Sequence, residues 1–70
     1  MKTLFSRILR EFLKDNCLSQ KAFAVETGIP WFKVNRWANG NSAPDYDELR
    51  KISETYDISA DYFLGLSESY

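Results

Sequence analysis

Residues 18–40 of this 70-residue chain, LSQKAFAVETGIPWFKVNRWANG, predict two short helices joined by a tight turn. Ser19 is a typical N-cap for the first helix, and Gly28 suits the left-handed residue that ends it. Pro30 lacks a backbone N–H and has a preset φ, so it fits the start of the second helix. Gly40 then terminates that helix. Two short helices around such a turn indicate a helix-turn-helix unit.

The second helix, over about residues 30–39, presents two faces. Its inward stripe is expected to contain Pro30, Val34, Trp37 and Ala38. Its outward stripe is expected to contain Trp31, Phe32, Asn35 and Arg36, with Lys33 on the flank. Exposed aromatic residues beside basic side chains indicate a binding partner. Duplex DNA is one candidate, because Arg reads guanine, Asn reads adenine and an aromatic edge packs on thymine methyl groups. The alternative is that Trp31 or Phe32 folds back onto the first helix as a core residue.

Polar residues at the edges of the two-helix unit are candidate contacts to the DNA backbone. Gln20 follows a helix N-cap, where backbone amides and the helix dipole attract phosphate. The loop after the second helix is expected to provide another contact. The alternative is that Gln20 and Lys21 are simply solvated. The candidates are Ser19, Gln20, Lys21, Lys33, Asn39, Asn41 and Ser42.

An amphipathic helix is expected before this unit, over about residues 2–15. Arg7, Arg10, Glu11 and Lys14 share one half of its helical wheel. The other half is a wide apolar face, which we expect either to be buried on several sides or to meet a second subunit. This face consists of Leu4, Phe5, Ile8, Leu9, Phe12 and Leu13.

Two more helices are expected after the loop at residues 41–44. Asp45 and Glu48 form a capping-box pattern for the fourth helix, whose apolar positions are Leu49, Ile52 and Tyr56. Ser59 caps a short fifth helix at residues 60–64, closed by Gly65. The prediction is an all-α fold of five helices without strands. One domain is expected over residues 1–66, followed by a frayed tail at residues 67–70.

The composition fits one small domain and leaves little room for catalysis. Hydrophobic residues make up 44% of the chain and aromatic residues 16%, which is enough for a packed core. No apolar run approaches the ~18 residues of a membrane span, and charges interrupt the N-terminal apolar stretch, so neither a membrane segment nor export is expected. Cys17 is the single cysteine, and histidine is absent. These residues cannot supply a zinc site, a Ser-His-Asp triad or a Cys-His pair, so we expect no enzyme and no cofactor.

The remaining reactive or acidic side chains have ordinary structural explanations. Cys17 is expected to be a small, partly buried residue rather than a redox switch. Four carboxylates lie close together in the sequence, but no Asp-rich loop of the calcium type is present. Helix capping and a solvated acidic surface explain them better than a metal site. They belong to Asp45, Asp47, Glu48 and Asp57.

The charges are divided unequally between the two parts of the chain. Residues 1–40 carry seven Lys or Arg and three Asp or Glu, a net charge of +4. Residues 41–70 carry two Lys or Arg and seven Asp or Glu, a net charge of −5, so the net charge of the whole chain is −1. A polyanion would therefore meet the first part and not the second. The alternative is that charge simply varies along a small chain.

Residues 18–40 resemble the helix-turn-helix of the phage-repressor/Cro-like (XRE-type) transcriptional regulators. The matching positions within the unit are Leu18-Ser19-Gln20, Ala24, Gly28, Ile29 and Asn39-Gly40. The resemblance covers about residues 4–66. It continues through Pro44, the LRKI of residues 49–52 and the ISADYFLG of residues 58–65.

The resemblance implies a five-helix domain that binds operator DNA, usually as a two-fold dimer. The helix at residues 30–39 would enter the major groove, and the helix before it, which begins after Ser19, would lie across the backbone. The implied base-reading residues are Trp31, Phe32 and Arg36, with Asn35 and Lys33 beside them. Gln20 would bind phosphate, and the loop from Asn39 to Ser42 would make a second backbone contact. A cytoplasmic repressor of bacterial or phage origin, without a small-molecule effector, is the implied function.

The chain departs from the family pattern at several positions. Trp31 and Phe32 replace polar or small residues, which favours packing on thymine methyl groups or on a protein partner. Pro30 replaces a Ser or Thr cap. Leu13 and Ala38 replace an Arg–Glu ion pair, which exchanges charge for hydrophobic packing. Asn16-Cys17 replaces a Gly, and Asn16 is expected to take the left-handed conformation. The alternative function is a protein-interaction module, such as an antitoxin or an anti-repressor partner, that uses the aromatic pair.

Overall fold

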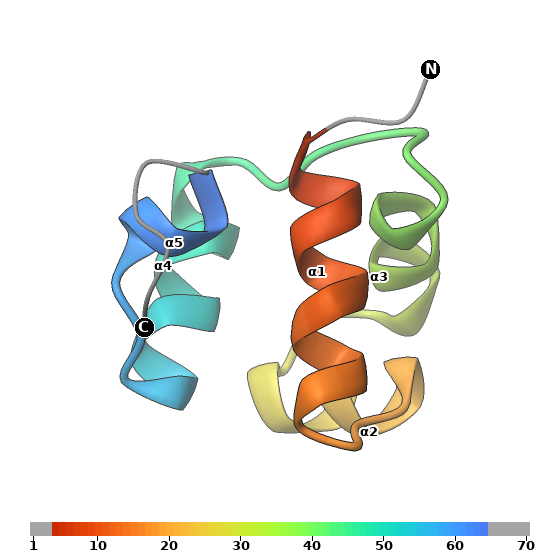
Figure 1. Ribbon diagram of the computed structural model, residues 1–70, viewed down its shortest axis with the longest axis horizontal. Coiled ribbons are helices and arrows are strands. Elements are labelled where there is room, and N and C mark those ends of the chain that lie inside the picture. Colours follow the sequence, from red (N-terminus) through yellow and green to blue (C-terminus); the bar gives the residue numbers. More distant parts are fainter. Residues whose placement is uncertain (1–3, 65–70) are drawn as a thin grey trace.

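The computed structural model describes residues 4–64 and confirms the all-α prediction (Figure 1). Within these residues the chain forms helices and no strand. The predicted helix start at Lys2, the closing Gly65, the domain end at residue 66 and the frayed tail at 67–70 lie outside the described residues. The helices are α1 (Leu4–Asp15), α2 (Gln20–Thr27), α3 (Trp31–Ala38), α4 (Tyr46–Tyr56) and α5 (Ala60–Leu64).

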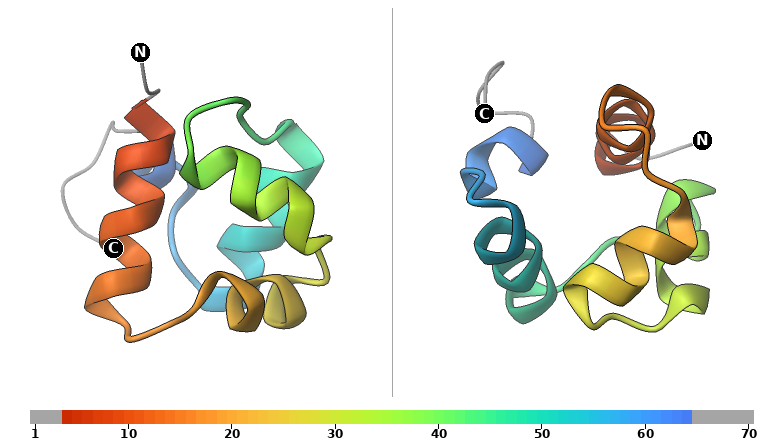
Figure 2. Two further views of the ribbon diagram at one scale, coloured as in Figure 1. Left: turned by 90° about the vertical axis from the view of Figure 1, so that its right-hand side faces the viewer. Right: turned by 90° about the horizontal axis from the view of Figure 1, so that it is seen from below.

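The two-helix unit is supported from behind by the rest of the fold. α3 contacts both α1 and α2, and α2 also contacts α4. α5 closes the arrangement by packing on α1 and α4. In Figure 1, α1 stands between α3 on one side and the α4–α5 pair on the other. Figure 2 (left) looks onto α3 with α2 below it, and no other helix covers α3 from that side.

The wide apolar face of α1 forms the centre of the core. The apolar side chains of this face that the structure describes are all buried within the protomer: Phe5, Ile8, Leu9, Phe12 and Leu13. The ring of Phe12 lies 6.4 Å from Phe23 of α2, 5.2 Å from Tyr56 of α4 and 5.4 Å from Phe63 of α5, measured between centroids. One side chain thus joins four helices. The expectation that this face is buried on several sides is confirmed, because the described apolar residues of α1 pack inside the protein.

Helices α1 to α4 all end in the same way. A residue with positive φ follows each helix: Cys17 (54°), Gly28 (73°), Gly40 (79°) and Asp57 (54°). The amide of the next residue then donates to the carbonyl five positions back, as in Leu18 to Leu13, Ile29 to Ala24, Asn41 to Arg36 and Ile58 to Ser53. This is the Schellman arrangement, which satisfies carbonyls that the helix end leaves unpaired. The predicted roles of the two glycines are confirmed.

The prediction for the end of α1 was wrong in two respects. Cys17, and not Asn16, takes the left-handed conformation. The helix continues to Asp15, so Asn16 is the cap residue, and its Nδ2 donates to the Phe12 carbonyl at 2.9 Å. The left-handed position therefore falls one residue later. Cys17 is also exposed rather than partly buried, since it lies at a turn on the surface.

The starts of α2, α4 and α5 agree with the sequence, and the start of α3 does not. Ser19 Oγ accepts from the Ala22 amide at 3.0 Å. Asp45 and Glu48 form the full capping box, in which each side chain accepts from the other residue's backbone N–H. Pro30, however, is exposed and precedes the helix, although it was expected in its inward stripe. Its ψ of 138° is extended, so its ring does not continue the helical face. Asn39 is likewise a cap and not the last helical residue.

Candidate nucleic-acid interface

The outward face of α3 carries exposed aromatic side chains. Trp31 is 47% exposed and Phe32 is 57% exposed, and Arg36 is exposed one turn further on. Neither ring joins the core, so the alternative of a core residue folded onto α2 is wrong. Two large apolar groups in solvent on one helix are costly unless a partner covers them.

The opposite face of α3 is fixed by α1. Val34, Trp37 and Ala38 are buried, as predicted. The Trp37 ring meets Phe5 edge-on at 5.9 Å between centroids. The buried Ser6 hydroxyl donates to the Ala38 carbonyl at 2.9 Å, which joins residues 32 positions apart. Together these contacts set how far the outward face of α3 projects.

A chain of amide hydrogen bonds crosses from α2 to the end of α3. Asn35 Nδ2 donates to Gln20 Oε1 at 3.1 Å. Asn39 Nδ2 donates to Asn35 Oδ1 at 3.2 Å. The oxygen of Gln20 is thus bound by Asn35, and no hydrogen bond within the described residues uses the amide N–H groups of Gln20. The three residues are brought together as candidate contacts, but Asn35 uses its oxygen and one N–H inside the protein.

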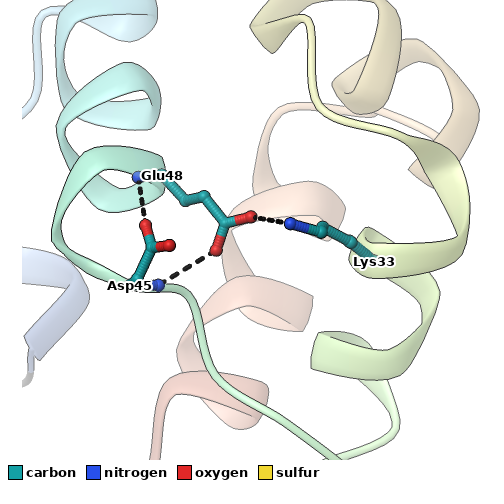
Figure 3. Close-up of polar contacts among 3 residues, drawn as sticks. All are labelled: Lys33, Asp45 and Glu48. Atoms are coloured by element: carbon teal, nitrogen blue, oxygen red, sulfur yellow. Dashed lines mark hydrogen bonds and ion pairs between the residues drawn. The ribbon is translucent and has the colours of Figure 1, made fainter.

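Lys33 is paired within the protein (Figure 3). Its Nζ lies 2.6 Å from Glu48 Oε2 of α4. The other oxygen of Glu48 accepts from the Asp45 amide at 3.0 Å, so the capping box of α4 holds the carboxylate that meets Lys33. The hydrogen bond from Lys33 to Glu48, together with the charges of Glu48 and Asp45, raises the pKa of Lys33 above its ordinary value. Sequence spacing could not reveal this pair, because its members belong to different helices.

A shallow apolar depression lies beside the aromatic pair, between α2 and the start of α3. It is lined by Lys21, Ala24, Val25, Ile29 and Trp31. Val25 is 81% exposed, the most exposed of the large hydrophobic residues described here. Val25 was not among the residues predicted from the sequence, although it lies two positions from the inward-facing Phe23, on the opposite side of the helical wheel of α2.

The position of α2 is fixed by α4 through Tyr56. Its ring stacks on Phe23 at 5.7 Å between centroids, and its hydroxyl donates to Glu26 Oε1 at 2.6 Å. Partial burial raises the pKa of Tyr56 well above its ordinary value, and the hydrogen bond to Glu26 adds to this effect. The carboxylate of Glu26 is thereby held on the α4 side of α2.

The remaining candidate backbone contacts lie on the surface around the unit. Ser19 and Lys21 are exposed at the start of α2, and Ser19 already serves as its N-cap. Asn39 and Asn41 are exposed after α3, and Ser42 is half-buried. Asn41 also closes the end of α3 through its backbone amide. Within residues 4–64, Lys33 is the one predicted backbone contact that forms an ion pair.

Comparison with known proteins assigns the family. The family described as helix-turn-helix matches residues 9–63, from within α1 to α5. The chain therefore belongs to the DNA-binding helix-turn-helix proteins of the XRE type, a family of transcription regulators. Neither the curated proteins nor the solved structures gave a match to this chain. In the described part of the chain, no helix has the length and apolar character needed to cross a membrane.

Proposed function

We propose that this protein is a sequence-specific regulator, and specifically a repressor, that places α3 in the major groove of an operator. The observation that carries this proposal is the outward face of α3, where Trp31, Phe32 and Arg36 are exposed on a helix held from behind by α1. A recognition helix of this kind contacts base edges, and the helix before it crosses the backbone. Repression would follow from occupying the operator.

The proposed base contacts come from the outward stripe. Arg36 can donate two hydrogen bonds to guanine O6 and N7. Trp31 and Phe32 supply apolar contacts. Asn35 has one amide N–H outside its bonds to Gln20 and Asn39, counted over the described residues, and this group can make a single hydrogen bond to a base.

The proposed backbone contacts surround this stripe. Gln20 presents its amide donors at the N-terminus of α2, where the helix dipole attracts phosphate. Among the other proposed contacts, Lys33 must first leave Glu48 before it can meet a phosphate. They are Ser19, Lys21, Lys33, Asn39, Asn41 and Ser42.

We also propose that two protomers bind together, as a two-fold dimer on DNA. The net charge of −1 gives a single protomer few phosphate contacts. Two protomers with recognition helices about 34 Å apart would meet successive turns of the same groove. The described apolar face of α1 is buried and does not supply the dimer contact. The acidic α4–α5 side, where Tyr46 is exposed, is the proposed contact surface.

A second candidate function is a protein-interaction module on the same fold. The observation that favours it is the exposure of Val25 beside Trp31 and Phe32, an apolar surface that a protein partner could also bury. Binding to DNA weakens steeply with added salt, whereas an aromatic contact to a protein does not. Salt dependence therefore separates the two candidates.

The test of the proposed function is selection from a pool of random duplexes at ~100 mM salt, close to physiological screening. We expect a pseudo-palindromic site with half-sites about one DNA turn apart. Arg36→Ala should relax the preference for guanine and cost ~1–3 kcal/mol on the selected site. Recovery of no site above background would contradict DNA recognition and favour the protein-interaction module.

A further inference from the structure

The exposed surface of the first turn of α3 is mainly apolar. Trp31 and Phe32 open the helix, and the cap before them is Pro30, which has no side-chain hydrogen bond to the helix. All three are exposed. No hydroxyl or carboxylate belongs to this turn. Its side-chain donors are the indole N–H of Trp31 and the ammonium of Lys33, and the rest of its exposed aromatic surface is apolar.

The polar side chains that follow on the same helix are already engaged. Lys33 is paired with Glu48. Asn35 has its oxygen bound by Asn39 and one N–H bound to Gln20. The paired donor and acceptor that reads adenine is therefore not available without breaking one of these bonds. Arg36 is left as the main outward hydrogen-bonding group among the described residues of α3.

Base pairs in the major groove present one apolar group, the 5-methyl group of thymine, and otherwise present hydrogen-bond donors and acceptors. An aromatic ring placed against those polar edges removes their water without replacing its hydrogen bonds, which is unfavourable. An aromatic ring placed against a methyl group buries apolar surface on both sides. The favourable occupant of this surface within a groove is thus thymine.

The charge around the aromatic pair agrees with a polyanion that carries such methyl groups. Lys21 lines the depression next to Trp31, and Arg36 is exposed on the same face. The sequence of α3 contains no acidic residue, and residues 1–40 carry a net charge of +4. A protein partner would need acidic and apolar groups side by side. The DNA groove already has both, in its phosphates and in the methyl groups of its thymines.

We propose that Trp31 and Phe32 determine specificity by packing on the 5-methyl groups of thymines in each half-site. This proposal rests on the proposed function and adds to it the chemical group that the first turn of α3 recognises. Arg36 then supplies the hydrogen-bonded contact to guanine, and Asn35 holds Gln20 and Asn39 in position.

The test replaces thymine by deoxyuridine in the duplex recovered by selection. This change removes the methyl group and keeps every hydrogen-bonding group of the base. Affinity should fall about fourfold for each thymine that the aromatic pair contacts, which corresponds to ~0.8 kcal/mol for one methylene-sized group. Placing 5-methylcytosine instead of cytosine at the same position should raise affinity by a similar factor.

The matched variants are Trp31→Ala with Phe32→Ala, and Arg36→Ala. The double variant should bind the thymine and deoxyuridine duplexes equally, whereas Arg36→Ala should retain the methyl preference and lose the guanine preference. All three side chains are exposed, so the variants should keep the helical circular dichroism of the parent.

The outcomes separate the inference from the proposed function. A selected duplex that binds equally well with deoxyuridine at every thymine would overturn methyl recognition and leave sequence-specific binding intact. A methyl preference that persists in the double variant would overturn the assignment to Trp31 and Phe32. A pool that yields no site would overturn both proposals and leave the aromatic pair to a protein partner.

Discussion

The ammonium of Lys33 in α3 and the carboxylate of Glu48 in α4 lie 2.6 Å apart, so the single lysine of α3 is neutralised within the protein. The Asp45 amide holds the second oxygen of the same carboxylate. The N-terminal capping box of α4 thus controls a charge on the face proposed to meet DNA. This arrangement can be changed without disturbing the helix start.

Glu48→Gln is expected to strengthen binding to every duplex. The glutamine oxygen can still accept from the Asp45 amide, but the ion pair is lost and Lys33 becomes available to phosphate. The slope of log K against log salt should become steeper by about 0.9 for each protomer. Fluorescence anisotropy with labelled duplexes at several salt concentrations measures both effects.

Glu54→Gln is the matched control for this prediction. It removes the same charge from α4 but breaks the exposed ion pair with Arg50 at 3.3 Å, away from Lys33. Its salt slope should equal that of the parent protein. If both variants changed the slope equally, overall charge and not the release of Lys33 would be the cause.

Cys17→Gly is expected to stabilise the protein. Cys17 has a φ of 54°, which costs a residue with a Cβ roughly 1–2 kcal/mol, and glycine adopts this conformation freely. After the loss of chain entropy from added glycine, a gain of about 0.5–1 kcal/mol should remain. The melting temperature should rise by about 4 °C, measured under reducing conditions.

The neighbouring substitution Asn16→Gly should have the opposite effect. Asn16 does not have a positive φ, and its side chain donates to the Phe12 carbonyl. Its removal should cost about 0.5–1.5 kcal/mol. A stabilising Asn16→Gly together with a destabilising Cys17→Gly would place the left-handed residue one position earlier than the structure does.

These two residues show how far sequence determines the fold. Gly28, Gly40 and the Asp45–Glu48 pair have local signatures, and their roles could be predicted because caps depend on a few adjacent residues. The end of α1 has no glycine, so no local signature marks Cys17 as the residue that takes the left-handed conformation. Asp57 takes the same conformation at the end of α4 without a signature that predicted it.

Tyr56→Phe is expected to change how stability depends on pH. Folding raises the pKa of Tyr56 through partial burial and the bond to Glu26, so the folded protein holds this proton more tightly than the unfolded chain, whose pKa is near 10. The resulting stability is fully present below pH ~10 and is lost as pH rises toward the folded pKa. The phenylalanine variant has no proton to lose at this position and should lack this part of the decline.

Urea unfolding of both proteins at pH 8 and above pH 10 measures this difference. At pH 8 the parent should be more stable by about 0.5–1 kcal/mol, a low value because Glu26 is exposed. The difference should shrink above pH 10. The lysines are the same in both proteins, so their contribution to the pH dependence of stability cancels in the comparison. A difference that stays constant or grows with pH would contradict the raised pKa.

The candidate site could be predicted in its residue types but not in its internal bonds. The outward position of Trp31, Phe32 and Arg36 follows from helical periodicity, and the structure places them outward. The bonds of Gln20 to Asn35 and of Lys33 to Glu48 depend on how two helices cross, which no local pattern contains. Those bonds decide which polar groups remain free to meet a partner.

Gln20→Glu is expected to weaken binding to every duplex alike. The change keeps an oxygen for Asn35 Nδ2, so the bond of 3.1 Å between the two helices can persist and stability should be little affected. It replaces the outward amide donors by a carboxylate oxygen, which repels phosphate at the N-terminus of α2. Gln20→Ala removes the donors without adding a charge and should give a smaller loss. The order of affinity should therefore be parent, then Gln20→Ala, then Gln20→Glu, with an unchanged preference among sequences. A loss restricted to the selected site would instead make Gln20 a base contact, because phosphates are the same in every duplex whereas base edges are not.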